Sequence, residues 1–151
     1  MASIFHQVAQ LSGDSMATPR KSRALCLCGC NRQVSRPSMR FYSNKCQQDW
    51  EYAQYIGRWK TGSENGSSGM LGSVSNHIKK YLREKYKDRC PSCGWSERHP
   101  LTQTVPLEID HINGDSSDNR EENLRLLCPN CHSLTPNYRA LNKGNGRGNR
   151  K

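Results

Sequence analysis

The chain has 151 residues, and its 23 lysines and arginines exceed its 13 acids by ten charges. Only 33% of the residues are hydrophobic, so a large apolar core is excluded and bound metal is a natural source of extra stability. No apolar run is long enough for a membrane span, and no export signal is evident, so we expect a cytoplasmic protein. The charge favours a polyanionic partner such as nucleic acid, and eight cysteines in a reducing compartment favour metal ligation over disulfides.

The first part of the chain is predicted to be a basic tail, residues 1–24, followed by a small cysteine-rich module, residues 25–59. A helix is expected from Gln47 to Trp59, where apolar side chains recur at three-residue spacing. Four cysteines precede or begin this helix and can form a second zinc knuckle, although the pattern leaves open whether all of them bind: Cys26, Cys28, Cys30 and Cys46. Gly29 must bend the backbone if the first three sulfurs are to reach one ion.

A Gly/Ser-rich stretch at residues 60–73 predicts a linker, so a domain boundary is expected there. The second domain is predicted to cover residues 74–142, with a basic tail at 143–151. Ser75 is a plausible N-cap for a helix that ends near Lys87. Its apolar stripe is expected to pack onto a zinc site and consists of Ile78, Leu82 and Tyr86, with Tyr81 beside it.

Two Cys-x-x-Cys pairs bracket most of the second domain and are typical of a structural zinc site closed by four thiolates: Cys90, Cys93, Cys128 and Cys131. Between them, Leu107–Ile112 and Leu124–Leu127 are predicted strands of a hairpin. A helix should begin within the CPNCH segment and stop before Pro136, and Thr135-Pro136 should begin a last helix at residues 137–141. The fold class is therefore a small, metal-stapled α+β protein in which a ββα unit carries the chemistry.

Four polar residues in this ββα unit are not needed by a four-sulfur zinc site. Asp110 and His111 are adjacent on a strand and point to opposite faces. His132, on the following helix, can return toward Asp110, and the two can hold a divalent cation with open positions for water and phosphate oxygens. His111 can act as a general base, and Asn123 can hydrogen-bond either His111 or a loop carbonyl. The sequence thus predicts a hydrolytic site beside the zinc staple.

The segment LEIDHINGDSSDNREENLRLLCPNCHSLT resembles the HNH nuclease motif, also called the ββα-metal or His-Me finger. His111, Asn123 and His132 match the H, N and H of that motif, and the paired cysteines match its zinc-stapled branch. The resemblance implies hydrolysis of DNA phosphodiesters with His111 as base, Asp110 and His132 as ligands of an ion such as Mg²⁺ or Mn²⁺, and Asn123 as orienter. It also implies 5′-phosphate products, frequent nicking, a bacteriophage source and work beside the large terminase subunit in DNA packaging.

Basic residues that flank the acidic loop are candidate contacts to double-stranded DNA: Lys79, Lys80, Arg83, Arg139, Lys143 and Arg147. Two other functions compete with an endonuclease, namely a zinc-stabilised DNA-binding module without catalysis and an accessory subunit of a terminase. A c-type haem site at CPNCH requires export, and a thioredoxin-like dithiol requires a βαβ context, so neither is favoured.

Overall fold

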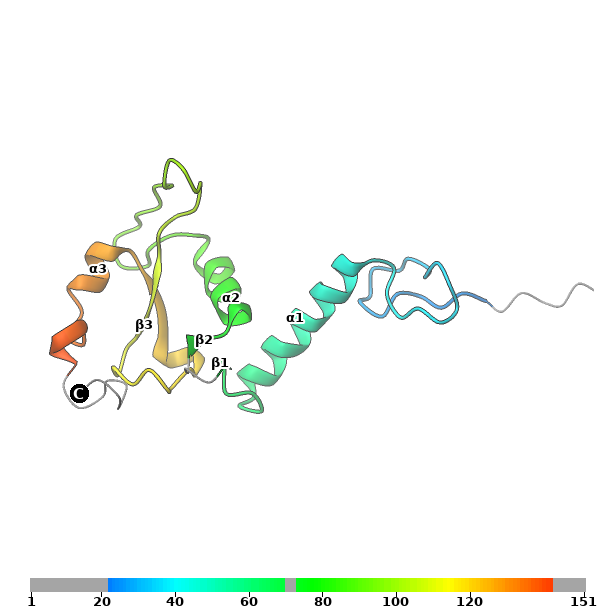
Figure 1. Cartoon of the computed structure of the whole chain (residues 1–151), viewed down its shortest axis with the longest axis horizontal. Coiled ribbons are helices and arrows are strands. Elements are labelled where there is room, and N and C mark those ends of the chain that lie inside the picture. The colour runs from blue at the N-terminus through cyan, green and yellow to red at the C-terminus, as the bar shows by residue number, and fades with distance from the viewer. Residues whose placement is uncertain (1–21, 70–72, 143–151) are drawn as a thin grey trace, which may run out of the picture.

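The computed structural model describes residues 22–69 and 73–142, which places most of the predicted tails, 1–24 and 143–151, outside the described residues. A long helix projects from an α+β body and carries the first cysteine cluster at its far end (Figure 1). The helices are α1 (Asn44–Lys60), α2 (Asn76–Tyr86) and α3 (Pro129–Ser133); the strands are β1 (Ser67–Ser68), β2 (Ser73–Val74), β3 (Glu108–His111) and β4 (Leu124–Leu127); two 3₁₀ turns cover Glu121–Asn123 and Arg139–Leu141. None of the helices in the described part of the chain is long and apolar enough to cross a membrane.

Helix α1 begins three residues before the predicted start at Gln47. The Ser43 side chain accepts a hydrogen bond from the backbone N–H of Cys46, an N-cap that brings this cysteine into the first helical turn. Helix α2 follows the prediction: Ser75 is its N-cap, and Lys87 ends it in the left-handed conformation. Both helix starts are therefore fixed by serine caps, of which only the second was predicted.

The main core lies between the two long helices and the β3–β4 hairpin. Trp59, Val74, Ile78, Leu82 and Leu124 are its buried members. The apolar stripe of α2 was expected to pack onto the zinc site, and this was wrong: Ile78 and Leu82 pack against Trp59 and the hairpin, whereas Cys90, Leu127 and Cys128 form a separate cluster. The indole of Trp59 reaches this core because it ends a helix that lies against α2.

The stretch 60–73, predicted as a linker, contains ordered structure among its described residues. Strands β1 and β2 pair antiparallel, and the backbone N–H of Ser75 donates to the carbonyl of Gly66. Gly66 has φ of +76°, and a β-carbon there would lie 2.6 Å from Cδ1 of Ile78, so this glycine allows the chain to pass close to α2. The end of α1 thus shares one core with α2 and the β3–β4 hairpin across the expected domain boundary.

The hairpin β3–β4 pairs Asp110 with Arg125 and His111 with Leu124. Because side chains alternate across a sheet, Ile109 and His111 face α2, whereas Glu108 and Asp110 face α3. Helix α3 follows β4 directly, with Pro129 at its first position and the Cys128 sulfur as its cap. The predicted helix at 137–141 is only a 3₁₀ turn over Arg139–Leu141, because the Thr135 hydroxyl donates to the carbonyl of His132 instead of capping a new helix.

Candidate active site

The four cysteines of the second domain come together beside the hairpin. The sulfurs of Cys90, Cys93, Cys128 and Cys131 all lie within 4.8 Å of one another, and those of Cys93 and Cys128 are 3.7 Å apart. Four sulfurs bound to one zinc ion at about 2.3 Å stand about 3.8 Å apart in a tetrahedron, so the spacing fits zinc. Trp95 and Leu127 pack against the buried Cys90 and Cys128, whereas Cys93 is exposed. The arrangement is compatible with a structural zinc that joins the two Cys-x-x-Cys segments.

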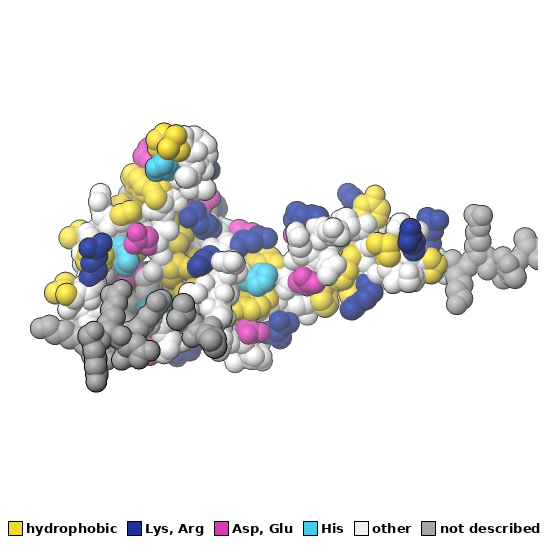
Figure 2. Space-filling view, in the orientation of Figure 1, with side chains coloured by type: hydrophobic (Ala, Val, Ile, Leu, Met, Phe, Trp, Pro, Cys, Tyr) yellow, Lys and Arg dark blue, Asp and Glu magenta, His cyan; other side chains and the backbone are white. Residues whose placement is uncertain are grey.

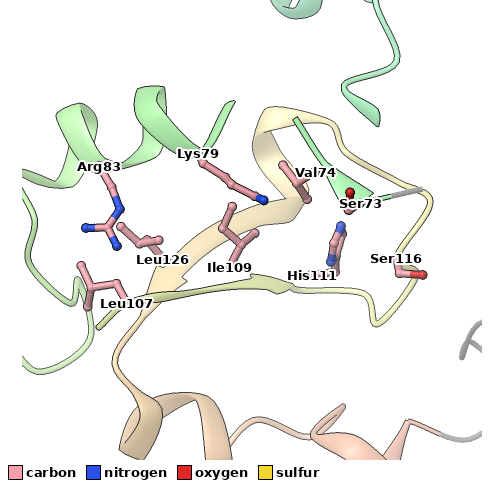
Figure 3. Close-up of a pocket in the computed structure, with 9 residues that line it drawn as sticks. All are labelled: Ser73, Val74, Lys79, Arg83, Leu107, Ile109, His111, Ser116 and Leu126. Carbon is pink, nitrogen blue, oxygen red and sulfur yellow. The ribbon is translucent and has the colours of Figure 1, made fainter. Parts of the chain in front are cut away.

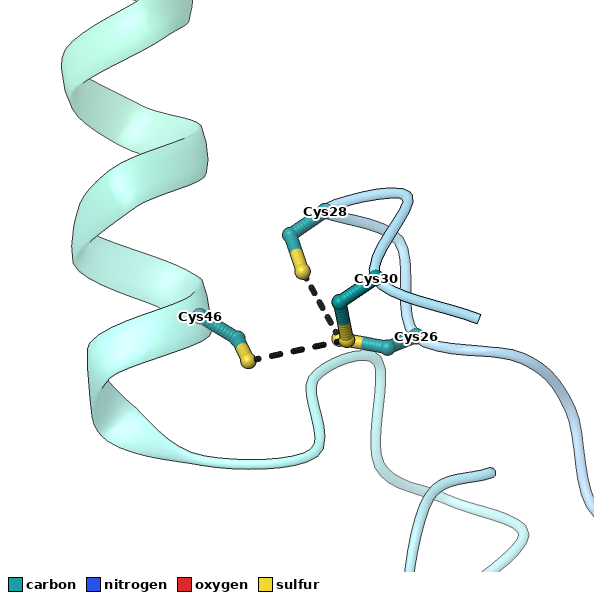
Figure 4. A group of neighbouring side chains, drawn as sticks. All are labelled: Cys26, Cys28, Cys30 and Cys46. Atoms are coloured by element: carbon teal, nitrogen blue, oxygen red, sulfur yellow. Dashed lines mark hydrogen bonds between the residues drawn. The ribbon is translucent and has the colours of Figure 1, made fainter. Parts of the chain in front are cut away.

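The first cysteine cluster is equally compact, and Figure 4 shows its origin: three cysteines come from one loop and Cys46 from the first turn of α1. All four sulfurs lie within 4.8 Å of one another, which confirms that Cys26, Cys28, Cys30 and Cys46 converge. The loop turns at Gly29, whose φ is +83°, as the spacing of its cysteines required. These residues fit a second structural zinc.

The pKa values of the thiols show which repulsion a bound cation would offset in such a cluster. At Cys90, burial opposes ionisation, but backbone hydrogen bonds from Cys128 and Cys93 lower the thiol pKa to about 6. Contacts with the sulfurs of Cys93 and Cys128 raise the pKa of Cys131 to about 12. One thiolate therefore forms readily, and the next forms against its negative charge. A bound dication would remove this repulsion, so all four thiolates could then form together.

On the α3 face of the hairpin, Asp110 and His132 come together as predicted. Asp110 is buried, and its Oδ1 lies 3.6 Å from Nε2 of His132. Its second oxygen, Oδ2, accepts a hydrogen bond of 2.7 Å from Nε of Arg125. Two ligands at about 2.1 Å from one ion stand about 3.0 to 3.4 Å apart, so a small shift would let both bind the same cation. Oδ1 of Asp110 and Nε2 of His132 point toward each other, so these are the two atoms available to bind the cation.

Glu108 completes this arrangement and was missed in the sequence. Its carboxylate contacts Nδ1 of His132. If Nδ1–H donates to Glu108, the lone pair of Nε2 is directed at Asp110, which is the tautomer that a metal-binding histidine requires. The signal was present, since Glu108 lies two residues before Asp110 on the same strand and must share its face.

On the α2 face, His111 lines a cleft of about 370 Å³ with an apolar floor that includes Ile109 and Leu126. Figure 3 shows the imidazole near Ser73 and the side chain of Lys79 extending over the same cleft. Asp110 and His132 are not among its lining residues. The candidate base and the candidate metal ligands thus lie on opposite faces of one hairpin.

The imidazole of His111 is held by Asn119, a second residue that sequence reasoning missed. Nε2 of His111 lies 3.0 Å from Oδ1 of Asn119. The Nδ2 group of Asn119 donates to the Ser67 hydroxyl, and its backbone carbonyl accepts from the indole N–H of Trp59. With its amide nitrogen engaged, Asn119 presents its oxygen to His111 as an acceptor. The β1 strand and the end of α1 therefore help to orient the candidate base.

Asn123 contacts the loop between the strands instead of His111. Its Oδ1 accepts from the backbone N–H of Asn113 at 2.9 Å, and its Nδ2 donates to the carbonyl of Asp118 at 2.7 Å. These two bonds tie the beginning and the end of the loop together. Of the two partners considered for Asn123, the structure shows the loop carbonyl.

The predicted DNA contacts differ in their surroundings. Lys79 and Arg83 line the His111 cleft, although Arg83 also pairs with Asp88. Lys80 lies away from this cleft, with its ammonium over the ring of Tyr52 and 3.8 Å from Glu84. Arg139 is exposed, and its guanidinium lies over Tyr138, whose ring packs edge-on against His132. Lys143 and Arg147 fall outside the described residues.

Comparison with known proteins bears on the same segment. Residues 90–136, which include the second cysteine cluster and all four candidate active-site residues, match the family model named HNH endonuclease. This segment is therefore similar to an HNH domain, and the name HNH domain is used for this part of the chain. The chain is also 39% identical over 95 residues to the H-N-H endonuclease F-TflIV of Escherichia phage T5, a match that covers 60% of this chain and 40% of the phage protein. The chain thus spans about two fifths of that relative, and no solved structure matches it.

Proposed function

We propose that this protein is a metal-dependent DNA endonuclease of the ββα-metal type that cuts phosphodiester bonds at the β3 edge of its HNH domain. The observation that carries the proposal is the position of Asp110 and His111 on consecutive residues of β3. Asn119 holds the ring of His111, and Asp110 lies beside His132 of α3. The HNH family match and the phage endonuclease relative support the same activity. A structural zinc site requires none of these side chains, so a purely DNA-binding module leaves them unexplained.

The opposite faces of the hairpin are compatible with a single reaction centre. Strand β3 pairs only with β4 among the described elements, so its other edge carries no strand. Consecutive residues on a strand are about 3.4 Å apart, and a phosphate at the free edge can therefore contact groups from both faces. In this arrangement His111 approaches from the α2 side, and Asp110 with His132 from the α3 side.

Each residue of the site then has its own role in the hydrolysis. The Nε2–H of His111 donates to Asn119, which leaves Nδ1 free to take a proton from the attacking water. Glu108 fixes the tautomer of His132, and Arg125 orients Asp110. A divalent cation held by Asp110 and His132 supplies stabilisation of the negative charge that develops on the phosphate. Lys79 and Arg83, in the cleft beside His111, position the DNA backbone.

Nicking of supercoiled plasmid in Mg²⁺ or Mn²⁺ tests this proposal. Wild-type protein should convert supercoiled to open-circular DNA, and ligase should reseal the nicks if they carry a 5′-phosphate. His111→Ala should reduce the rate by about 10²- to 10⁴-fold, the usual contribution of a general base. His77→Ala is the matched control, because His77 is exposed on α2 and packs against Tyr55 outside the cleft.

Equal rates for His111→Ala and wild type would refute the assignment of the base. No nicking by either protein, with DNA binding retained, would favour the non-catalytic module. Strong nicking only in the presence of the large terminase subunit would favour the accessory-subunit hypothesis. The phage relative supports a phage-encoded enzyme acting in the host cytoplasm, and the packaging role stays a prediction from the family resemblance.

A further inference from the structure

The cysteine-rich module at the end of α1 has a one-sided charge. Residues 22–48 contain no aspartate or glutamate and five basic side chains, of which Lys45 pairs with Asp49 of the next turn and four are arginines: Arg23, Arg32, Arg36 and Arg40. The four arginines are exposed, and Figure 2 shows Lys and Arg side chains spread over this end of the molecule. This charge matches a polyanion.

Two of these arginines stack on aromatic rings. The guanidinium of Arg40 lies 5.8 Å from the ring centre of Phe41 and 5.9 Å from that of Trp50. The guanidinium of Arg32 lies 5.1 Å from the ring centre of Tyr42. Stacking restricts the side chain and leaves the N–H groups at its edge able to donate, so less entropy is lost when a phosphate binds. The module thus presents partly preorganised donors for phosphate oxygens.

Helix α1 joins this surface rigidly to the HNH domain. Cys46, in its first turn, belongs to the cysteine cluster, and Trp59, in its last turn, is buried in the domain core. Between them, the Tyr52 hydroxyl donates to Glu84 of α2 at 2.6 Å, which ties the middle of the helix to the same domain. The thirteen residue steps from Cys46 to Trp59 correspond to about 20 Å of helix, or about six base pairs of B-DNA. The spacing between the module and the catalytic part is therefore built into the fold.

We infer that the N-terminal module is a second, sequence-independent binding site for the phosphate backbone of duplex DNA. It engages the substrate at a fixed distance from the HNH domain and makes binding depend on duplex length. This inference rests on the proposed function, because it takes duplex DNA as the substrate. Two linked sites on one duplex bind far more tightly than either alone, provided the DNA is long enough to reach both.

The test compares binding to a hairpin-closed duplex of about five base pairs, which is about 17 Å long, with binding to a duplex of about 30 base pairs; only the longer one exceeds the separation of about 20 Å and reaches both sites. Every protein in this test also carries His111→Ala, and the protein with this change alone is the background protein. The proposed catalytic base is then absent, so the DNA is not cut during the binding measurement. The module variant adds Arg36→Ala and Arg40→Ala, and the matched control adds Arg58→Ala and Arg98→Ala, which remove the same charge from exposed arginines outside the basic segment 22–48. Zinc analysis accompanies each variant, and unchanged metal content shows that the module remains folded.

The background protein and the control should bind the longer duplex at least about tenfold more tightly than the shorter one. The module variant should lose most of this advantage, and its binding should become less salt-dependent by about 0.9 in log–log slope for each lost phosphate contact. An advantage that survives in the module variant, or that disappears equally in the control, would overturn the inference. Wild-type nicking without any length advantage would overturn the inference alone, whereas length-dependent binding without nicking would overturn only the proposed enzyme.

Discussion

Asn123→Ala is a test of how the loop before β4 supports the catalytic base. Asn123 is buried, and the variant removes its two bonds to the backbone of Asn113 and Asp118. A buried backbone group left without its partner costs about 1–3 kcal/mol, and water can reach the exposed Asn113 end. We therefore expect a loss of about 2 kcal/mol in the free energy of unfolding. For a domain of this size, that loss lowers the melting temperature by about 8–16 °C.

The same variant should slow nicking without abolishing DNA binding. Asn119, which holds His111, lies in the loop that Asn123 ties together, so the imidazole should lose its fixed orientation. A misplaced catalytic group reduces rates by up to about 100-fold. Thermal unfolding and plasmid nicking, measured on the same preparation, check both effects.

Asn123→Asp separates a loop-supporting residue from a metal ligand. Aspartate keeps the acceptor for Asn113 but loses the donor to the carbonyl of Asp118, so it should also be destabilised and slow. If Asn123 were instead a metal ligand, Asn123→Asp should keep or gain nicking activity, because carboxylates bind hard cations well. A wild-type melting temperature for Asn123→Ala would contradict the argument, and loss of activity without loss of stability would place Asn123 in the chemistry itself.

Two further predictions concern stability. Cys131→Ser should remove about one zinc equivalent and unfold the HNH domain, because metal binding provides much of the folding free energy of such domains; an unchanged zinc content would exclude this staple. Burial opposes ionisation of Glu121, but hydrogen bonds from Lys85 and Tyr81 hold its pKa below the ordinary value. The stabilisation by ionised Glu121 is therefore present above the pKa of the unfolded chain and is lost as the pH falls. Glu121→Gln should lower the free energy of unfolding by about 1–2 kcal/mol at neutral pH, and the free energies of unfolding of variant and wild type should converge in acid. Denaturant titrations at several pH values measure this difference.

The parts of the fold that local sequence determines were predicted well. The Ser75 cap and both strands of the hairpin follow from short-range patterns, and the structure confirms them. The two cysteine clusters were inferred from spacing typical of zinc sites, with the binding of all four N-terminal cysteines left open, and the structure brings each set together. The short C-terminal turn was misjudged because the hydroxyl of Thr135 has a competing acceptor, the carbonyl of His132.

The missing pieces of the site depend on contacts between distant segments. The role of Asn119 emerges only when Ser67 and Trp59 reach it from 52 and 60 residues away. The linker prediction for 60–73 followed composition, whereas the observed packing of Gly66 depends on its neighbours in three dimensions. By contrast, Glu108 could have been found, because strand alternation alone places it beside Asp110.

The most direct test of the account is chemical rescue of His111→Ala by free imidazole. If the ring of His111 takes the proton from water, imidazole that diffuses into the cleft beside Asn119 should restore a measurable part of the nicking rate. The rescue should saturate with imidazole concentration and should not occur in Asp110→Ala, which lacks a proposed metal ligand. A His111→Ala protein that nicks at the wild-type rate without imidazole would contradict the assignment of His111 as the base.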